Sequence, residues 1–385
     1  MSEMSYLEKL LDGVEVEWLP LGHIAAIKTG QSVNKNMISK NPGVYPVINS
    51  GREPLGFINT WNTDNDPIGI TTRGAGVGSV IWQEGKYFRG NLNYSITIDK
   101  KNHINIRYMY HALLHMKNDI HELCTFDGIP ALNAGSLKKL LIPIPCPDNP
   151  EKSLAIQSEI VRILDKFTVL TAELTAELTA ELNMRKKQYN YYRDQLLSFK
   201  EGEVEWKTLG EVAVIGTGNH DTQDAIEHGK YIFYARGREP LKLNVFDFDE
   251  TAIITAGDGA GVGKVFHYAK GKYALHQRAY RIVPNAFMNP RFVYHYITAY
   301  FFTYIQKASV SSSVTSLRRP MFLKFPIPVP PSEEQARIVE ILDKFDTLTN
   351  SITEGLPREI ELRQKQYEYY RDLLFSFPKP ETVSN

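Results

Sequence analysis

The chain has only two cysteines in 385 residues, Cys124 and Cys146, and neither lies in a recognisable motif. Two thiols are too few for a structural zinc cluster, so buried or incidental thiols are the simpler interpretation. No run of about eighteen apolar residues is present, and the N-terminus lacks the basic and apolar segments of a signal peptide. Together with the length, these absences predict a cytoplasmic protein of several domains with no membrane segment.

Motifs for catalysis or cofactor binding are also missing. The stretch DGAGVGKV resembles a phosphate-binding loop, but Asp258 takes the place of its first glycine and Val265 that of its hydroxyl residue. The patterns H-E-x-x-H, G-x-S-x-G and N-P-P-[YF] are absent, and the glycine-rich stretches contain no G-x-G-x-x-G. The ten histidines are scattered, which favours satisfied or surface positions. We therefore expect no catalytic residue, metal site or cofactor on this chain.

The net charge of zero argues against a strongly basic nucleic-acid binder. Its distribution is more informative. Basic and acidic residues number 13 and 11 in Glu15–Pro150, 15 and 12 in Glu201–Pro331, and 7 and 11 in Ser332–Asn385. The two large segments, with a local charge of about +2 and +3, therefore favour contact with a polyanion weakly, and the tail does not.

Six ordered matches show an internal repeat. The pairs are Glu15–Trp18 with Glu203–Trp206 (EVEW), Gly51–Leu55 with Gly237–Leu241 (GREPL), Gly74–Gly78 with Gly259–Gly263 (GAGVG), Pro143–Pro145 with Pro326–Pro328 (PIP), Ile163–Phe167 with Ile341–Phe345 (ILDKF), and RKKQYNYYRDQLLSF from Arg185 with RQKQYEYYRDLLFSF from Arg363. The offset falls from 188 to 178 residues and is constant over the last two pairs. Each copy is therefore a variable globule followed by a more constant segment.

Apolar periodicity predicts the elements of each copy. Short apolar runs predict strands, at Gly69–Thr72, Tyr94–Ile98, Ala252–Thr255 and Tyr280–Val283, and helices are expected near Arg107–His121 and Arg291–Gln306. The constant segments follow proline-rich stops and have apolar residues at three- and four-residue spacing, as amphipathic helices do. The prediction is an α+β fold with two mixed α/β globules related by pseudo-twofold symmetry and separated by two long antiparallel helices packed as a coiled coil. The expected boundaries are 1–150 (first globule with an N-terminal helix), 151–200 (central helix), 201–331 (second globule) and 332–385 (distal helix and tail).

Glycine loops at strand ends lie beside arginines in both globules. A tight turn is one explanation, since glycine supplies positive φ. The other is that glycine lets the backbone approach a DNA duplex, while arginine bridges phosphates or reads guanine edges. The nearby polar residues differ between copies, as is required of two domains that recognise different DNA sequences. The candidates are Arg52, Arg73, Gly74, Gly76, Asn91, Asn93 and Tyr94 in the first copy and Arg236, Arg238, Asp258, Gly259, His276, Gln277 and Arg278 in the second.

Two further loops, Thr125–Lys139 and Ala308–Arg319, are small and polar and end in paired basic residues. They suit phosphate contact or are simply solvated loops, and both explanations stay open at this point. The candidates are Lys138, Lys139, Ser312, Arg318 and Arg319.

The segments K-Q-Y-x-Y-Y-R-D place aromatic residues on one helix face. This periodicity favours packing, or a docking surface for another subunit, over a surface for nucleic-acid stacking. The candidates for docking are Tyr189, Tyr192, Arg193, Tyr367, Tyr370 and Arg371.

Three copies of TAEL occupy Thr171–Leu182 in the central helix. The glutamates at 173, 177 and 181 have an unfavourable four-residue spacing, and only Glu181 has a favourable partner, Arg185. The repeat therefore looks like a unit kept for its length, about 6 Å and a net turn of about 40° per copy. The spacer positions are Thr171, Leu174, Thr175, Leu178, Thr179 and Leu182.

This arrangement resembles the specificity subunits of type I restriction-modification enzymes. The resemblance rests on the two variable globules, their P-[IL]-P stops, an E-Q-x-x-I-V-x-[IL]-L-D-K-F helix and the K-Q-Y-x-Y-Y-R-[DE] segment. The motif is complete at Pro326–Phe345 and looser at Pro143–Phe167, where Gln157 keeps the glutamine. The TAEL copies are similar to those of the IC subgroup.

The resemblance implies that the globules are target-recognition domains, each reading half of a split double-stranded DNA site. It also implies two modification subunits that carry S-adenosylmethionine and methylate adenine, and restriction subunits that use ATP and Mg²⁺. The chain itself is then a non-catalytic subunit. The alternatives are a coiled-coil adaptor that binds only proteins and an autonomous DNA methyltransferase.

Overall fold

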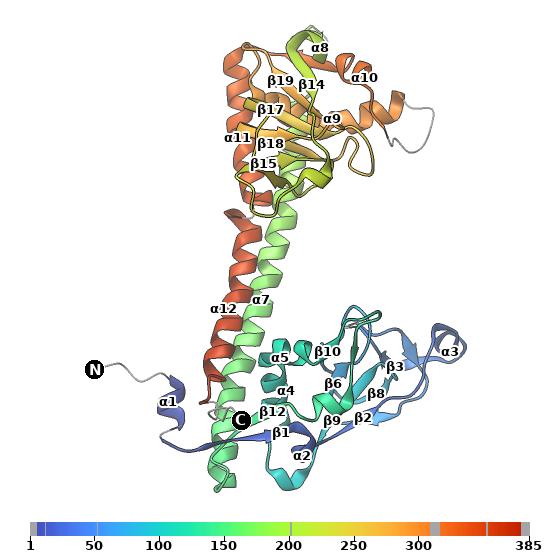
Figure 1. The fold of residues 1–385 in the computed structure, drawn as a ribbon, viewed down its shortest axis with the longest axis vertical. Coiled ribbons are helices and arrows are strands. Elements are labelled where there is room, and N and C mark those ends of the chain that lie inside the picture. The colour runs from blue at the N-terminus through green and yellow to red at the C-terminus, as the bar shows by residue number, and fades with distance from the viewer. Residues whose placement is uncertain are drawn as a thin grey trace. The chain divides into compact units, whose positions relative to one another are not determined.

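The computed structural model describes residues 6–11, 13–51, 53–200, 202–308, 316–351 and 353–378. The chain forms two compact units: unit 1 takes the residues up to 176 and those from 361 onward, and unit 2 takes residues 177–360. Helix α7 (Pro150–Leu196) is continuous over 47 residues and contributes to both (Figure 1). The predicted α+β class is confirmed, since each unit combines β-sheets with helices.

Unit 1 contains two four-stranded sheets and two strand pairs. The first sheet has the order β2 (Ala25–Thr29), β9 (Asn93–Ile98), β6 (Ile68–Thr71) and β7 (Val80–Trp82), and the second β4 (Phe57–Ile58), β3 (Pro42–Ile48), β8 (Lys86–Arg89) and β5 (Thr63–Asp64). The pairs are β1 (Val16–Pro20) with β12 (Leu141–Pro145) and β10 (Cys124–Thr125) with β11 (Ala131–Leu132). The helices before α7 are α1 (Tyr6–Leu11), α2 (Leu21–Ile24), α3 (Lys35–Lys40), α4 (Ile106–His115), α5 (Lys117–Glu122) and α6 (Ala134–Leu137).

Unit 2 repeats this plan with a single six-stranded sheet. Its order is β14 (Ala213–Thr217), β19 (Ala279–Pro284), β17 (Phe248–Ala256), β18 (Phe266–Leu275), β15 (Tyr231–Tyr234) and β16 (Leu241–Leu243), and β13 (Glu205–Thr208) pairs with β20 (Pro326–Val329). Its helices are α8 (Leu209–Val212), α9 (Pro290–Ala308), α10 (Arg319–Leu323), α11 (Ser332–Asn350) and the start of α12 (Gly355–Leu374). Strand β18 pairs with both β17 and β15. In unit 1 the equivalent pairings are divided between β7 and β8, so the two sheets of unit 1 correspond to one sheet in unit 2.

Segments from both ends of the sequence close the core of unit 1. Leu7 and Leu11 of α1 join the buried cluster that contains Phe375 and Phe377, which follow α12. The indole Nε1 of Trp18 donates a hydrogen bond of 2.7 Å to the carbonyl of Pro378. Removing these apolar side chains from water is the main source of stability for such a cluster.

A buried glutamine ties each globule to its helix. In unit 2, Gln335 on α11 accepts a hydrogen bond from the backbone N–H of Asn289 (2.6 Å) and donates to the carbonyls of Phe287 (3.2 Å) and Pro330 (2.9 Å). In unit 1, Gln157 on α7 accepts from the N–H of Asn105 at 2.8 Å. Both side chains are about 1 % exposed or less, so water does not replace these bonds. The glutamine of the repeated helix motif is therefore a structural attachment.

An aspartate adds a second attachment about two turns further along each helix. Oδ1 of Asp343 lies 2.6 Å from Nε of Arg291 and 2.6 Å from Nε2 of His295, both on α9. The equivalent contacts of Asp165 are 2.9 Å to Arg107 and 2.8 Å to His111, on α4. Charge-assisted hydrogen bonds of this kind are stronger than neutral ones. They hold α4 against α7 and α9 against α11.

The second helical segment was predicted to be one continuous helix, but it is interrupted. Helix α11 ends at Asn350 and α12 begins at Gly355, where φ is +79°. A Cβ at Gly355 would lie 2.5 Å from the carbonyl oxygen of Thr347, and Pro357 fits only the first turn of a helix because it lacks an N–H. The periodicity continued across this interruption and therefore did not reveal it.

Within unit 1, helices α7 and α12 pack antiparallel, as predicted. Phe167 stacks on Tyr370 with ring centroids 4.8 Å apart, and the hydroxyl of Thr168 donates to that of Tyr367 at 3.3 Å. Residue numbers increase along α7 in the direction in which they decrease along α12, so the two helices are antiparallel.

The His111–Asp165 contact predicts a dependence of stability on pH. Burial of the His111 imidazole lowers its pKa below the ordinary value of 6.5, although Asp165 opposes the shift. In unfolded chains this histidine gains a proton as the pH falls through about 6.5, whereas in the folded unit it stays neutral to lower pH. Unit 1 therefore loses stability below pH 6.5, by at most about 1.4 kcal/mol per pH unit from this group.

Urea unfolding at pH 7.5 and 5.5 tests this. In a Trp206→Phe background the remaining tryptophans, at 18, 61 and 82, all lie in unit 1, so their fluorescence reports on that unit. The stability advantage of the parent over His111→Gln should shrink as the pH falls. An advantage that stays constant or grows contradicts the assignment.

Candidate nucleic-acid interface

The glycine loop of unit 1 follows β6 and is joined to the β10–β11 hairpin. The N–H of Gly74 donates to the carbonyl of Pro130 (2.9 Å), that of Leu132 donates to Thr72 (2.8 Å), and Arg73 and Ala131 form an isolated antiparallel bridge. The two loops that the sequence suggested separately are therefore parts of one surface.

Unit 2 builds the same joint from different residues. Asp258 and Ser316 form the bridge, and the N–H of Leu317 donates to the carbonyl of Gly257 at 2.7 Å. A tyrosine supports the joint in each unit: the hydroxyl of Tyr94 donates to Leu132 (3.3 Å), and that of Tyr280 donates to Leu317 (3.5 Å). Tyr94 thus acts as a support for the frame.

The glycines of these loops have three roles. Gly263 has a φ of +66°, and a Cβ there would lie 2.5 Å from Cδ1 of Ile305, so this glycine is needed for packing. Gly74 and Gly259 also have positive φ (+91° and +82°), but a Cβ on either would meet nothing within 4 Å. Their loops therefore present open backbone to an approaching ligand. Gly76 has a third role, because a Cβ there would crowd the carbonyl of Ser50 at 3.0 Å.

Three positions around the glycine loop correspond between the units and carry different side chains. The correspondence follows from strand pairing, since the parallel register of β3 with β8 in unit 1 matches that of β15 with β18 in unit 2. The residues are Ser50, Arg73 and Leu92 in unit 1 and Arg236, Asp258 and Arg278 in unit 2. An equivalent backbone frame thus presents different chemistry.

In unit 2 the three side chains form one ionic cluster. Asp258 accepts hydrogen bonds from Nη1 of Arg236 (2.9 Å, Oδ1) and Nη1 of Arg278 (3.0 Å, Oδ2). Burial alone would raise the pKa of Asp258, but the two arginines hold it below its usual value. Arg236, Asp258 and the glycine loop line a hollow of about 540 Å³, together with Arg238 and Lys264. The side chains of Arg236 and Arg278 remain 41 % and 62 % exposed.

Two predicted contact residues have buried side chains. Asn93 is fully buried and accepts a hydrogen bond from Nη1 of Arg89 at 2.5 Å. His276 is 1 % exposed, and its Nδ1 accepts the N–H of Arg278 at 2.9 Å. Both hold neighbouring residues in place. Their polarity made them candidates, but the sequence does not show which way a side chain points.

The other candidates on the loops lie at the surface. Gln277 donates to Asp221 at 2.9 Å. The backbone of Lys138, after α6, accepts a hydrogen bond from Gly22 of α2 at 2.9 Å. The exposed candidates are Arg73, Asn91, Lys138, Lys139, Arg236, Arg238, Gln277, Arg278, Arg318 and Arg319. Arg52 and Ser312 lie outside the described residues.

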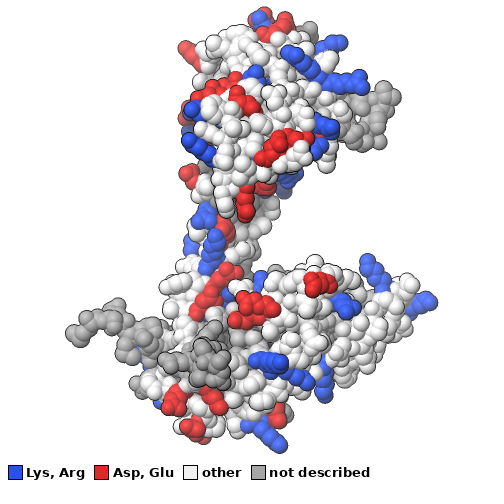
Figure 2. Space-filling model, in the orientation of Figure 1, with Lys and Arg blue, Asp and Glu red and all other residues white. Residues whose placement is uncertain are grey.

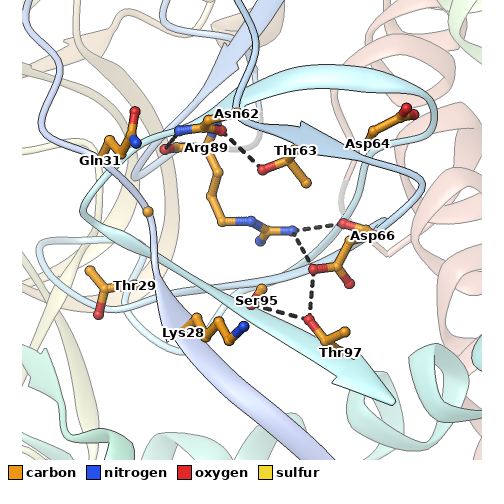
Figure 3. Close-up of a pocket in the computed structure, with 11 residues that line it drawn as sticks. Lys28, Thr29, Gln31, Asn62, Thr63, Asp64, Asp66, Arg89, Ser95 and Thr97 are labelled. Atoms are coloured by element: carbon orange, nitrogen blue, oxygen red, sulfur yellow. Dashed lines mark hydrogen bonds and ion pairs between the residues drawn. The ribbon is translucent and has the colours of Figure 1, made fainter. Parts of the chain in front are cut away.

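Sequence reasoning missed a buried arginine in unit 1. Arg89 extends into a polar hollow of about 360 Å³ (Figure 3). Its guanidinium donates to the carbonyls of Asp66 (2.7 Å), Ile68 (3.2 Å) and Tyr94 (3.1 Å) and to the Tyr87 hydroxyl. With most of its N–H groups engaged, Arg89 braces the sheets and is poorly placed to bind a ligand.

Basic and acidic side chains are interspersed on the face shown in Figure 2, without a continuous basic surface on either unit. This agrees with the small excess of positive charge in each globule. On this face a polyanion would meet scattered basic groups and not a continuous basic surface.

The repeated tyrosines pack against the other copy of the repeat. Tyr370 stacks on Phe167, and Tyr192 stacks on Phe345 with ring centroids 5.5 Å apart. Tyr189 lies 6.3 Å from Phe345, and burial raises its pKa to about 12. Tyr367 receives the hydrogen bond from Thr168, and Arg193 and Arg371 lie over Tyr189 and Tyr367 at 5.9 Å. The ILDKF and KQYxYY motifs are thus partners in helix packing.

The TAEL copies lie within α7 without a break. Thr171, Leu174, Thr175, Leu178 and Leu182 are partly buried and Thr179 is exposed, as expected of a helix with one packed face. Glu181 pairs with Arg185 at 2.6 Å.

Within the described ranges, no group of three or more His, Cys, Asp or Glu side chains is arranged to hold a metal ion. Both cysteines are free thiols, and burial raises the pKa of Cys124. In the same part of the chain, no helix has both the length and the apolar character that crossing a membrane requires.

Comparison with known proteins identifies the family. A sequence model of the type I restriction modification DNA specificity domain matches residues 13–184 and 201–362. The chain belongs to this family, as a specificity subunit rather than a catalytic one.

Full-length relatives agree with this assignment. The specificity subunit of the type I restriction enzyme EcoR124I/EcoR124II of Escherichia coli is 44 % identical over 421 aligned positions, covering 100 % of both chains. The EcoprrI specificity subunit of the same species is 37 % identical, over 92 % of this chain and 93 % of its own length.

Solved structures share the fold. The S subunit of a type I restriction-modification system from M. genitalium superposes with a TM-score of 0.55 at 19 % identity, covering 98 % of this chain and 100 % of its own. A chain from a structural study of complex assembly in a type I system gives 0.59 at 14 % identity, covering 94 % of this chain and 97 % of its own.

The glycine loops predict unequal effects for two matched substitutions. Gly259→Ala should cost about 1–2 kcal/mol, because only its positive φ is disturbed. Gly263→Ala should cost about 1–3 kcal/mol more, because its Cβ collides with the buried Ile305. Hydrogen exchange of the α9 amides measures the difference, and equal protection in the two variants would contradict it.

Proposed function

We propose that this chain recognises a double-stranded DNA site in two halves, one read by each unit. The observation that carries the proposal is the glycine loop joined to a neighbouring chain segment, built twice with different polar side chains at corresponding positions. Two readers of different sequences need a common frame and different contact groups. The membership of the specificity family supports the same function.

The proposal includes partners and their cofactors. Two modification subunits with S-adenosylmethionine would methylate adenine, and restriction subunits using ATP and Mg²⁺ would join them, most simply in the cytoplasm where the DNA is. Relatives named as subunits of type I restriction enzymes support this, as does the complex-assembly study of a chain with the same fold. Such partners would also supply part of the phosphate contact that the weakly charged globules lack.

The docking surface we propose lies on the outer side of the repeated tyrosine segments. Tyr189, Tyr192, Tyr367 and Tyr370 take part in packing within this chain, as described above. The intervening tyrosines, Tyr191 and Tyr369, are 62 % and 63 % exposed. Two copies of one patch suit two copies of one partner, and exposed tyrosines are common anchors in interfaces.

Footprinting with the modification partner tests the function. Two protected patches of DNA separated by an unprotected gap are expected, and methylated adenines should map to that bipartite site. A single patch, or no protection, would contradict the proposal and favour an adaptor that binds only proteins. Methyl transfer by the purified chain alone would favour an autonomous methyltransferase.

We further propose that the TAEL copies set the gap between the half-sites and place the chain in the IC subgroup. One copy turns a helix by a net 40° or so, close to the roughly 34–36° between successive base pairs. Its rise of about 6 Å exceeds the roughly 3.4 Å of a base pair, so tilt or DNA distortion has to absorb the remainder. The interruption between Asn350 and Gly355 offers a place where the facing helices adjust to a change in α7.

Deletion of Thr179–Leu182 should shorten the unread gap by about one base pair and leave both half-site sequences unchanged. Mapping of methylated adenines in cells that carry the variant and its partner measures gap and half-sites together. Glu177→Gln, which leaves the length of α7 unchanged, is the matched control and should keep the original gap. An altered half-site with an unaltered gap would refute the role of the repeat.

A further inference from the structure

The ionic cluster in unit 2 is suited to a base edge more than to a phosphate. Asp258 sits between Arg236 and Arg278, and its carboxylate would repel a phosphate brought close to both guanidinium groups. A base edge is neutral and offers acceptors without this repulsion. Guanine presents two of them, O6 and N7, in the major groove, and a planar guanidinium matches both.

The geometry leaves the arginines able to make such a contact. Each has five N–H donors, and the hydrogen bonds to Asp258 use only an Nη1 group from each. Their exposed fractions, 41 % and 62 %, show that both guanidinium groups reach solvent. The bonds to Asp258 restrict their rotamers before DNA arrives, which reduces the entropy lost on binding.

The backbone around the cluster is open. Gly259, next to Asp258, has free space where a side chain would be, and Gly237, next to Arg236, has its nearest neighbour 3.9 Å from such a Cβ. The cluster borders the hollow of about 540 Å³ described above. These two glycines therefore leave open space directly beside the cluster.

Unit 1 provides the internal comparison. Its corresponding side chains are Ser50, Arg73 and Leu92, and their net charge equals that of Arg236, Asp258 and Arg278. The only cation of the unit 1 triplet, Arg73, occupies the position of the anion in unit 2, Asp258. The overall charge of the triplet is thus the same in both units, and the pattern of donors and acceptors differs. A role in nonspecific phosphate attraction would depend on charge, whereas a role in sequence readout depends on pattern.

We infer that Arg236, Asp258 and Arg278 form the base-reading cluster of unit 2 and that it takes a G·C-containing step in the major groove. Arg236 and Arg278 contact guanine, and Asp258 is a positioning residue that holds both. The inference rests on the proposed function, because it names what one half-site contains.

Single-base-pair variants of the mapped site test it, with the full chain assembled with its modification partner. Arg236→Lys and Arg278→Lys keep the charge and remove the planar fork. At least one should lower affinity for the parent site about ten- to a hundredfold, with the loss confined to a G·C pair in one half-site. The salt dependence and the other half-site should stay as in the parent. Arg337→Lys, on the exposed face of α11, is the matched control and should change nothing.

Asp258→Asn separates positioning from simple damage. It removes the carboxylate that repels phosphates, so affinity for unrelated DNA should hold or rise while the preference for the cognate base pair falls. A structural defect would lower both affinities together, and thermal unfolding checks that the variant is folded.

Two results would overturn the inference. One is a loss of affinity of the same size for all DNA sequences, which marks a contact with phosphate or sugar and not with a base. The other is an unchanged base preference in all three variants. Failure of the proposed function gives a different observation, because the parent complex would then protect no bipartite site.

Discussion

The attachment of each globule to its helix is the constraint on which the rest of the structure depends. A glutamine that is almost completely buried, Gln157 or Gln335, bonds to backbone groups of the adjoining globule, and an aspartate fixes a second point about two turns along. Apolar residues of each helix, such as Ile160 and Ile338, are buried in the core of the same globule and add to these attachments. With these attachments, each glycine loop has a defined position relative to the helix axis, and the spacer role proposed for α7 requires this.

Much of the fold could be predicted because the sequence contains two copies of one unit, and each copy can be compared with the other. Matching strings showed the repeat and the shared glycine loops, and apolar runs and periodicity in each copy located strands and helices. Periodicity identified the packed helix faces but not their partners, so it could not show that Tyr370 meets Phe167 of the other copy. The interruption after Asn350 was also missed, since the apolar spacing continues across it.

The candidate site was predicted residue by residue but not as a cluster. Arg236, Asp258 and Arg278 come from three separate segments, and the register of β15, β17, β18 and β19 brings them together. Polar composition also could not distinguish exposed tips from buried supports, which is why Asn93 appeared among the contact residues. Both units thus keep the supporting tyrosine, Tyr94 or Tyr280, and differ in the groups that reach solvent.

Closure of unit 1 by residues near position 377 has a consequence for synthesis on the ribosome. Unit 2 is an uninterrupted stretch inserted into unit 1, so all of its residues are available while the N-terminal unit still lacks Phe375 and Phe377. Until those residues emerge, the surface around Tyr108 that they cover stays open to water and to wrong partners. Unit 1 begins first but is completed only after all of unit 2 has been translated, so a chain that stops before Phe375 lacks part of the core of unit 1 although it contains all of unit 2.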